Sequence, residues 1–122
     1  MTSDKELYEI QDDDAYRHFR AGMVKMHAGG RCDTTEEWLK TTNAAFAELE
    51  QAHAIEPDNP HIVYQMAWCK EFLRAPPDEM VPILELALQL CNNPAYQHTG
   101  HIVDLVTYAI TEYRKQPGGV DG

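Results

Sequence analysis

Hydrophobic residues recur at helical spacing in five stretches of the chain, and glycine or proline separates one stretch from the next. In the central stretch four apolar residues follow one another at intervals of four, three and three, which places them on one side of a helix: Ala45, Leu49, Ala52 and Ile55. Pro57 and Pro60 cannot continue that helix. We therefore predict that one helix ends near Glu56 and that another begins near Pro60.

The first two predicted helices carry recognisable signals at their ends. Asp12 or Asp13 is a good N-cap for the first helix, and Gly29, with the glycine after it, ends the helix. Thr34 and Glu37 have the spacing of a capping box. The second helix should therefore begin near residue 35 and be long.

The third predicted helix begins at Pro60 and is apolar on most sides, as expected of a middle helix with neighbours on both flanks. The Pro76-Pro77 pair ends it, and Asp78 is placed to cap a fourth helix that starts at 78–80 and runs to about Leu90. Pro82 is compatible with that helix only in its first turn.

A fifth predicted helix runs to about Lys115 and would cap the array of helices. Its apolar stripe comprises Ile102, Leu105, Val106, Ala109, Ile110 and Tyr113. Its polar outer face, which an array needs to stay soluble, comprises Thr99, Asp104, Thr107, Thr111, Glu112 and Arg114. We expect an all-α fold of about five helices in one domain over residues 13–115. Residues 1–12 are expected to form an acidic N-terminal arm or helix extension, and residues 116–122 a flexible tail.

The central stretch resembles the tetratricopeptide repeat family. In that family the second helix of a hairpin carries a small residue, a bulky one, an alanine and a proline at the spacing of Ala45, Leu49, Ala52 and Pro57. The match is weaker elsewhere: Ala21-Gly22 with Gly29 fits in part, and Ala87 follows Ala52 by one residue more than the family's period. The resemblance implies antiparallel helical hairpins that present the first helix of each hairpin on a concave, ligand-binding surface.

Composition narrows the classes of partner and location. Of the 122 residues 43% are hydrophobic and 25% charged, as in a folded globular domain, and the formal net charge is −10. We therefore expect neither nucleic acid nor an anionic membrane as a partner. No apolar run approaches the ~20 residues of a membrane span, and the first thirty residues lack the order of a signal peptide, so we expect a cytoplasmic protein.

Histidine and cysteine offer an alternative reading, a small metal- or redox-responsive helical protein. His98 and His101, with Cys91 upstream, are the best candidates, but a metal site needs three or four converging ligands. No disulfide framework, catalytic motif or cofactor motif is present, so we expect reduced thiols, no enzyme activity and no cofactor. Cys69 lies between aromatic residues and should be buried, whereas Cys32 lies in a loop.

The tetratricopeptide resemblance places a set of aromatic residues, methionines and neighbouring polar residues on the concave face: Tyr16, Phe19, Met23, Met26, His27, His61, Tyr64, Trp68, Glu71 and Phe72. Such a set suits an adaptor or scaffold that binds a peptide or helix, or a second copy of itself, through an apolar groove. The alternative is that the same residues form a packed core, because buried aromatic residues are commoner than ligand anchors. The groove hypothesis expects Phe19, Met23, Tyr64 and Trp68 to be partly exposed. Members of the family that bind the terminal carboxylate of a peptide use Lys and Asn at these positions, so the resemblance does not imply such a carboxylate clamp here.

Overall fold

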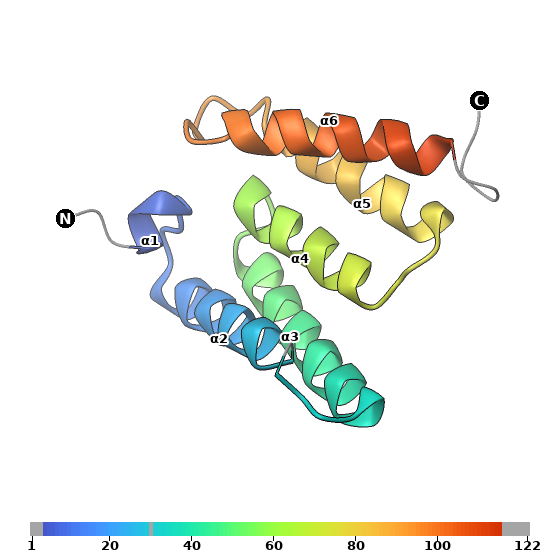
Figure 1. Ribbon diagram of the computed structural model, residues 1–122. Helices are drawn as coiled ribbons and strands as arrows, with labels where there is room; N and C mark the ends of the chain where they lie inside the picture. Colours follow the sequence, from blue (N-terminus) through green and yellow to red (C-terminus); the bar gives the residue numbers. More distant parts are fainter. Residues whose placement is uncertain (1–3, 30, 116–122) are drawn as a thin grey trace.

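The computed structural model describes residues 4–29 and 31–115, and these ranges contain six helices and no strand. The helices are α1 (Asp4–Leu7), α2 (Asp13–Gly29), α3 (Thr35–Ile55), α4 (Pro60–Phe72), α5 (Pro77–Leu90) and α6 (Gly100–Arg114). Figure 1 shows that α2 to α6 alternate in direction and that each packs on the next along the chain. The prediction of an all-α fold is confirmed, and the single turn of α1 adds to the five expected helices.

The caps of the first two long helices follow from local chemistry. The Asp12 carboxylate accepts hydrogen bonds from the backbone N–H groups of Asp14 (2.8 Å) and Ala15 (3.0 Å), so Asp12 is the residue that caps α2. The Thr34 hydroxyl accepts from the N–H of Glu37 at 3.1 Å and caps α3. Side-chain oxygens thus satisfy N–H groups that have no partner inside a helix.

Helices α2 and α3 cross closely at Gly22. A Cβ atom at this position would lie 2.9 Å from side-chain carbons of Leu49 and 3.1 Å from the carbonyl oxygen of Ala45, so only glycine fits without movement. Ala45, Leu49 and Ala52 are fully buried, as predicted for the central stretch. Ile55 is the exception: it is the last residue of α3, where the chain turns away, and it is exposed.

Helix α4 lies in the middle of the molecule, between the α2–α3 pair and the α5–α6 pair (Figure 1). Ile62 and Cys69 belong to the core cluster shared with α2 and α3, whereas Val63 and Ala67 belong to the cluster shared with α5 and α6. This double packing explains why the sequence of α4 is apolar on most of its sides.

Three expectations about the later helices are wrong. Helix α5 begins at Pro77 after Pro76, which makes no side-chain cap, so Asp78 lies inside the first turn instead of capping it. The earlier start places Pro82 in the second turn, where it has no N–H to donate to a preceding carbonyl. In α6 the buried stripe is narrower than predicted, because Leu105 is exposed.

The N-terminal segment is joined to the helical domain. Ile10 is buried in the same cluster as Phe19 and Leu49, so contacts cross the predicted boundary between residues 12 and 13. The predicted tail, residues 116–122, lies outside the described residues. No helix in the described ranges combines the length and apolar character that crossing a membrane requires.

Candidate functional site

Helix α4 carries a row of four aromatic rings at helical spacing: His61, Tyr64, Trp68 and Phe72. The rings of Tyr64 and Trp68 meet edge to face with centroids 6.1 Å apart, and those of Trp68 and Phe72 are tilted at 6.2 Å. His101 of α6 stacks on His61 at 6.1 Å and meets Tyr64 edge to face at 6.0 Å. One side of α4 is thus lined with aromatic rings from end to end.

Exposure rises steadily along this row. His61 is 1% exposed and Tyr64 8%, whereas Trp68 is 36% and Phe72 43% exposed. The N-terminal half of the row is therefore covered by protein, and the C-terminal half faces outward.

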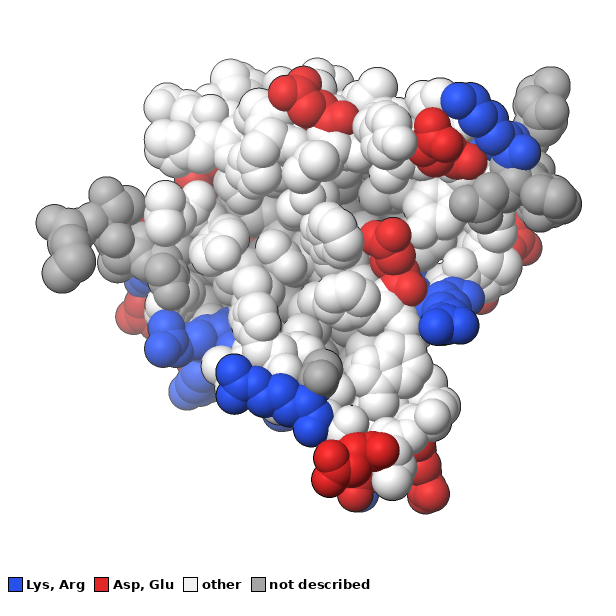
Figure 2. Space-filling view, viewed as in Figure 1, with Lys and Arg blue, Asp and Glu red and all other residues white. Residues whose placement is uncertain are grey.

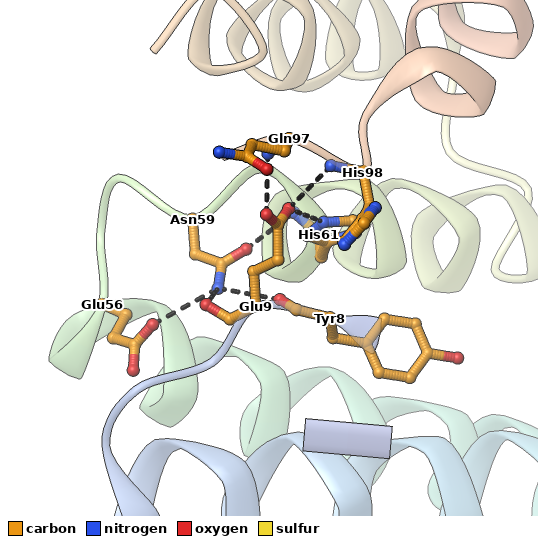
Figure 3. Close-up of polar contacts among 7 residues, drawn as sticks. All are labelled: Tyr8, Glu9, Glu56, Asn59, His61, Gln97 and His98. Carbon is orange, nitrogen blue, oxygen red and sulfur yellow. Dashed lines mark hydrogen bonds and ion pairs between the residues drawn. The ribbon is translucent and has the colours of Figure 1, made fainter. Parts of the chain in front are cut away.

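The covered end is held by Glu9, which reaches α4 from the N-terminal segment (Figure 3). Its carboxylate accepts hydrogen bonds from His61 Nε2 at 2.9 Å and from the backbone N–H groups of Gln97 at 2.7 Å and His98 at 3.1 Å. Glu9 has a φ of 53°, which is unfavourable for a residue with a side chain. The hydrogen bonds compensate for that backbone conformation and tie together three segments distant in sequence.

Asn59 completes the covered end and is fully buried. Its Oδ1 accepts from the N–H of His61 at 2.9 Å, which caps α4, while its Nδ2 donates to the carbonyls of Tyr8 and Glu9 at 3.2 and 3.3 Å. Glu56 accepts from the N–H groups of residues 11 and 12. The N-terminal segment is thus fastened along its length to the turn between α3 and α4.

Burial lowers the pKa of His61, an effect that the Glu9 carboxylate opposes in part. Burial acts to raise the pKa of Glu9, but the hydrogen bonds from Gln97, His61 and His98 outweigh it and the pKa is lowered. At neutral pH an uncharged imidazole therefore donates to a carboxylate. The hydrogen bond between Glu9 and His61 therefore stabilises the fold by connecting the N-terminal segment to α4.

The open end of α4 borders two hollows. The first, which we call the α2–α4 hollow, has a volume of about 400 Å³. It is lined by Met23, Met26, His27, Trp38, Gln65, Trp68 and Phe72. Apart from His27 and Gln65, these side chains are apolar, and the two methionines are half-buried.

The second, the α4–α6 hollow, has a volume of about 340 Å³. Its lining residues from α4 are Tyr64, Ala67, Trp68 and Glu71, those from α5 are Met80 and Leu84, and those from α6 are Leu105, Val106, Tyr108, Ala109, Glu112 and Tyr113. Trp68 lines both hollows, so it separates them. Figure 2 shows that the face over α4 and α6 is largely uncharged, with acidic side chains at several points.

The groove hypothesis is correct for the exposure of some residues and wrong for others. Met23 and Trp68 are partly exposed, as expected. Phe19 and Tyr64 are buried: Phe19 packs on Tyr8 at 4.7 Å between ring centroids, and Tyr64 is covered by α6. His61, bonded to Glu9, is buried as well.

The remaining candidates lie around the same face. Met26, His27 and Phe72 line the α2–α4 hollow, and Glu71 lines the α4–α6 hollow. Tyr16 is half-buried near Phe19 and lines neither hollow. Whether these residues bind a partner stays a prediction.

Sequence reasoning missed Trp38 and the contribution of α6. Tyr108 is 67% exposed and Leu105 49% exposed, and both line the α4–α6 hollow. Their apolar surface extends the buried stripe of α6 sideways, so the helix is apolar over a wider arc than a capping helix needs. The width of this apolar arc is the sequence feature that indicates an exposed apolar surface on α6, because a helix with one covered face needs only one narrow apolar stripe.

His98 and His101 of the alternative reading both lie near His61 at the covered end of α4, and His101 stacks on it. Within the described residues no three His, Cys, Asp or Glu side chains are grouped so as to hold a metal ion. Cys91 and Cys32 are half-buried, and Cys69 is fully buried with its Sγ 3.3 Å from the carbonyl oxygen of Thr42. Burial raises the pKa of Cys69 to about 11.

Comparisons with protein-family models, curated proteins and solved structures find no match for this chain. The tetratricopeptide resemblance therefore rests on the spacing of the residues that carry it. Function has to be inferred from the contacts, exposure and charges of the open face.

Proposed function

We propose that this chain is a protein-interaction module that binds a segment of another protein across the open end of α4. The observation that carries the proposal is the exposure of Trp68 and Phe72, two large aromatic side chains side by side, with an apolar hollow next to them. Exposed aromatic and methionine side chains at one place are typical of binding surfaces.

The finer architecture proposed here is a short tetratricopeptide-like array. Three features support it: consecutive helices alternate in direction, Gly22 allows a close crossing of α2 and α3, and the hollows lie between α2, α4 and α6. In such an array the first helices of successive hairpins form the binding face, which matches α2, α4 and α6.

A helix or extended peptide is the occupant that the dimensions favour. Each hollow has room for one or two side chains and is too small for a folded loop to enter. Side chains from successive turns of a partner helix could enter the two hollows on either side of Trp68. A second copy of the chain remains the alternative occupant.

A displayed library of random peptides, selected on the full chain, tests the proposal. Selected peptides should bind the Phe72→Ala variant about tenfold or more weakly, because the substitution removes an exposed anchor. Ile55→Ala is the matched control, because Ile55 is similarly exposed but lines neither hollow. Binding to this control should be unchanged.

Sedimentation of the chain over a range of concentrations distinguishes the alternative occupant. A monomer that binds selected peptides supports the proposal. Peptides that bind the Phe72→Ala variant as tightly as the original chain would overturn it.

A further inference from the structure

The two hollows differ in charge. Among the described residues neither Asp nor Glu lines the α2–α4 hollow, whereas Glu71 and Glu112 line the α4–α6 hollow. The α4–α6 hollow also has four aromatic rings in its lining: Tyr64, Trp68, Tyr108 and Tyr113. No lysine or arginine is among the described residues that line it.

Glu71 is the carboxylate available to a ligand. It is exposed, and burial, with the nearby charge of Glu71 adding to it, raises the pKa of the Tyr113 hydroxyl. Among the described residues Glu71 is in no ion pair, whereas Glu112 is 3.4 Å from Lys115. Glu71 therefore contributes a negative charge to a hollow of aromatic rings, and among the described residues this charge is not taken up by an ion pair.

We propose that the α4–α6 hollow receives an arginine side chain of the partner protein, between the aromatic rings and Glu71. This inference rests on the proposed function and names the chemistry of its partner. A planar guanidinium stacks on aromatic rings and donates two parallel hydrogen bonds to a carboxylate, so rings and carboxylate together favour arginine.

The charge of the whole chain agrees with this occupant. A net charge of −10 attracts basic segments and repels acidic ones during encounter. The neighbouring α2–α4 hollow, with its methionines and Trp38, suits an apolar side chain. The partner segment should therefore carry arginine and an apolar residue one or two helical turns apart.

Binding of a single side chain can be measured with N-acetyl-arginine amide, and N-acetyl-citrulline amide is the neutral analogue of nearly the same shape. In NMR titrations of the full chain the arginine probe should shift the ring signals of Trp68 and Tyr108, with a dissociation constant of order mM. The citrulline probe should bind at least about fivefold more weakly. The ring signals of Trp38, outside this hollow, report non-specific effects.

Glu71→Gln tests the carboxylate without changing the shape of the side chain. It should weaken binding of the arginine probe about fivefold or more, and added salt should weaken binding to the original chain. Glu50→Gln removes the same charge from an exposed position on α3 and should leave binding unchanged. Equal binding of arginine and citrulline probes, or no effect of Glu71→Gln, would overturn the inference.

The failure of this inference is distinguishable from failure of the proposed function. If selected peptides depend on Phe72 but lack arginine, the proposed function stands and the arginine inference is wrong. If the arginine probe binds but the affinity of selected peptides does not depend on Phe72, the arginine site stands and the proposed binding face is wrong. If the chain forms a dimer that dissociates when the arginine probe is added, the hollow binds a second copy of the chain, and the inference that its partner is a different protein is wrong.

Discussion

The two ends of α4 carry the same kind of side chain in opposite surroundings. At the N-terminal end His61 is buried under Glu9 and hydrogen-bonded to it, and Tyr64 is covered by α6. At the C-terminal end Trp68 and Phe72 continue the same row of rings but remain partly exposed. Position on the helix does not explain this difference, because all four residues lie on one side of it.

The difference is caused by segments distant in sequence. Residues 8–10 and 97–98 close over the N-terminal end through the Glu9 and Asn59 hydrogen bonds. No comparable set of polar contacts reaches the other end within the described residues. An aromatic stripe is thus core where the rest of the chain covers it and a candidate binding surface where the rest does not.

The largest expected effect comes from truncating Phe19 of α2, which packs on Tyr8 at the covered end, and Phe72 at the open end of α4. Phe19 is buried beside Tyr8, so Phe19→Ala should lower the free energy of unfolding by about 3–5 kcal/mol. Phe72→Ala removes the same atoms from an exposed site and should cost about 1 kcal/mol. Urea denaturation of both variants measures the difference. Equal losses would mean that the two ends are not distinct.

Asn59→Ala should lower the free energy of unfolding by about 2–3 kcal/mol, because it removes the cap of α4 and leaves the carbonyls of Tyr8 and Glu9 without this donor. Asn43→Ala is the matched control: Asn43 is exposed and bonds only within its own helix, to Leu39. The control should be neutral or slightly stabilising. Equal effects of the two variants would contradict the role given to Asn59.

Acid should weaken the covered end. The pKa of His61 is lowered by burial, so below its usual value of 6.5 the unfolded chain binds a proton that the folded chain does not, and stability falls as the pH falls. The lowered pKa of Glu9 adds a further loss below its usual value of 4.5. Charges on His98 and His101 act on His61 in the same direction as burial.

Urea denaturation at pH 7.5 and pH 5.5 measures this effect. His61→Gln should flatten the dependence of stability on pH over this interval, and His27→Gln, at an exposed position, should preserve it. If the His61→Gln variant shows the same dependence of stability on pH as the original chain, groups other than His61 cause that dependence.

The smallest effect concerns thiol reactivity and does not involve stability. Cys69 is buried and its pKa is about 11, so it should react with a thiol reagent far more slowly than Cys32 in native protein. Single-cysteine variants allow each rate to be followed separately. Rapid labelling of Cys69 would show that the side of α4 facing α3 opens readily.

Local sequence signals predicted most of the helices, but they did not predict that the N-terminal segment covers one end of α4. Thr34 and Pro60 mark helix ends through chemistry confined to a few residues, and the buried face of α3 follows from its spacing. The bond between Glu9 and His61 spans 52 positions, and no local pattern specifies it. For the same reason Phe19 and Tyr64 could not be told from exposed residues by spacing alone.

The most direct test of the open end is Trp68→Ala, followed in two measurements on the same protein. Trp68 is partly exposed, so the free energy of unfolding should fall by only about 1–2 kcal/mol. The affinity for selected peptides should fall by about 2 kcal/mol or more, roughly thirtyfold, because Trp68 separates the two hollows. A loss of more than about 3 kcal/mol in stability with unchanged peptide affinity would make Trp68 a core residue and contradict the proposed binding face.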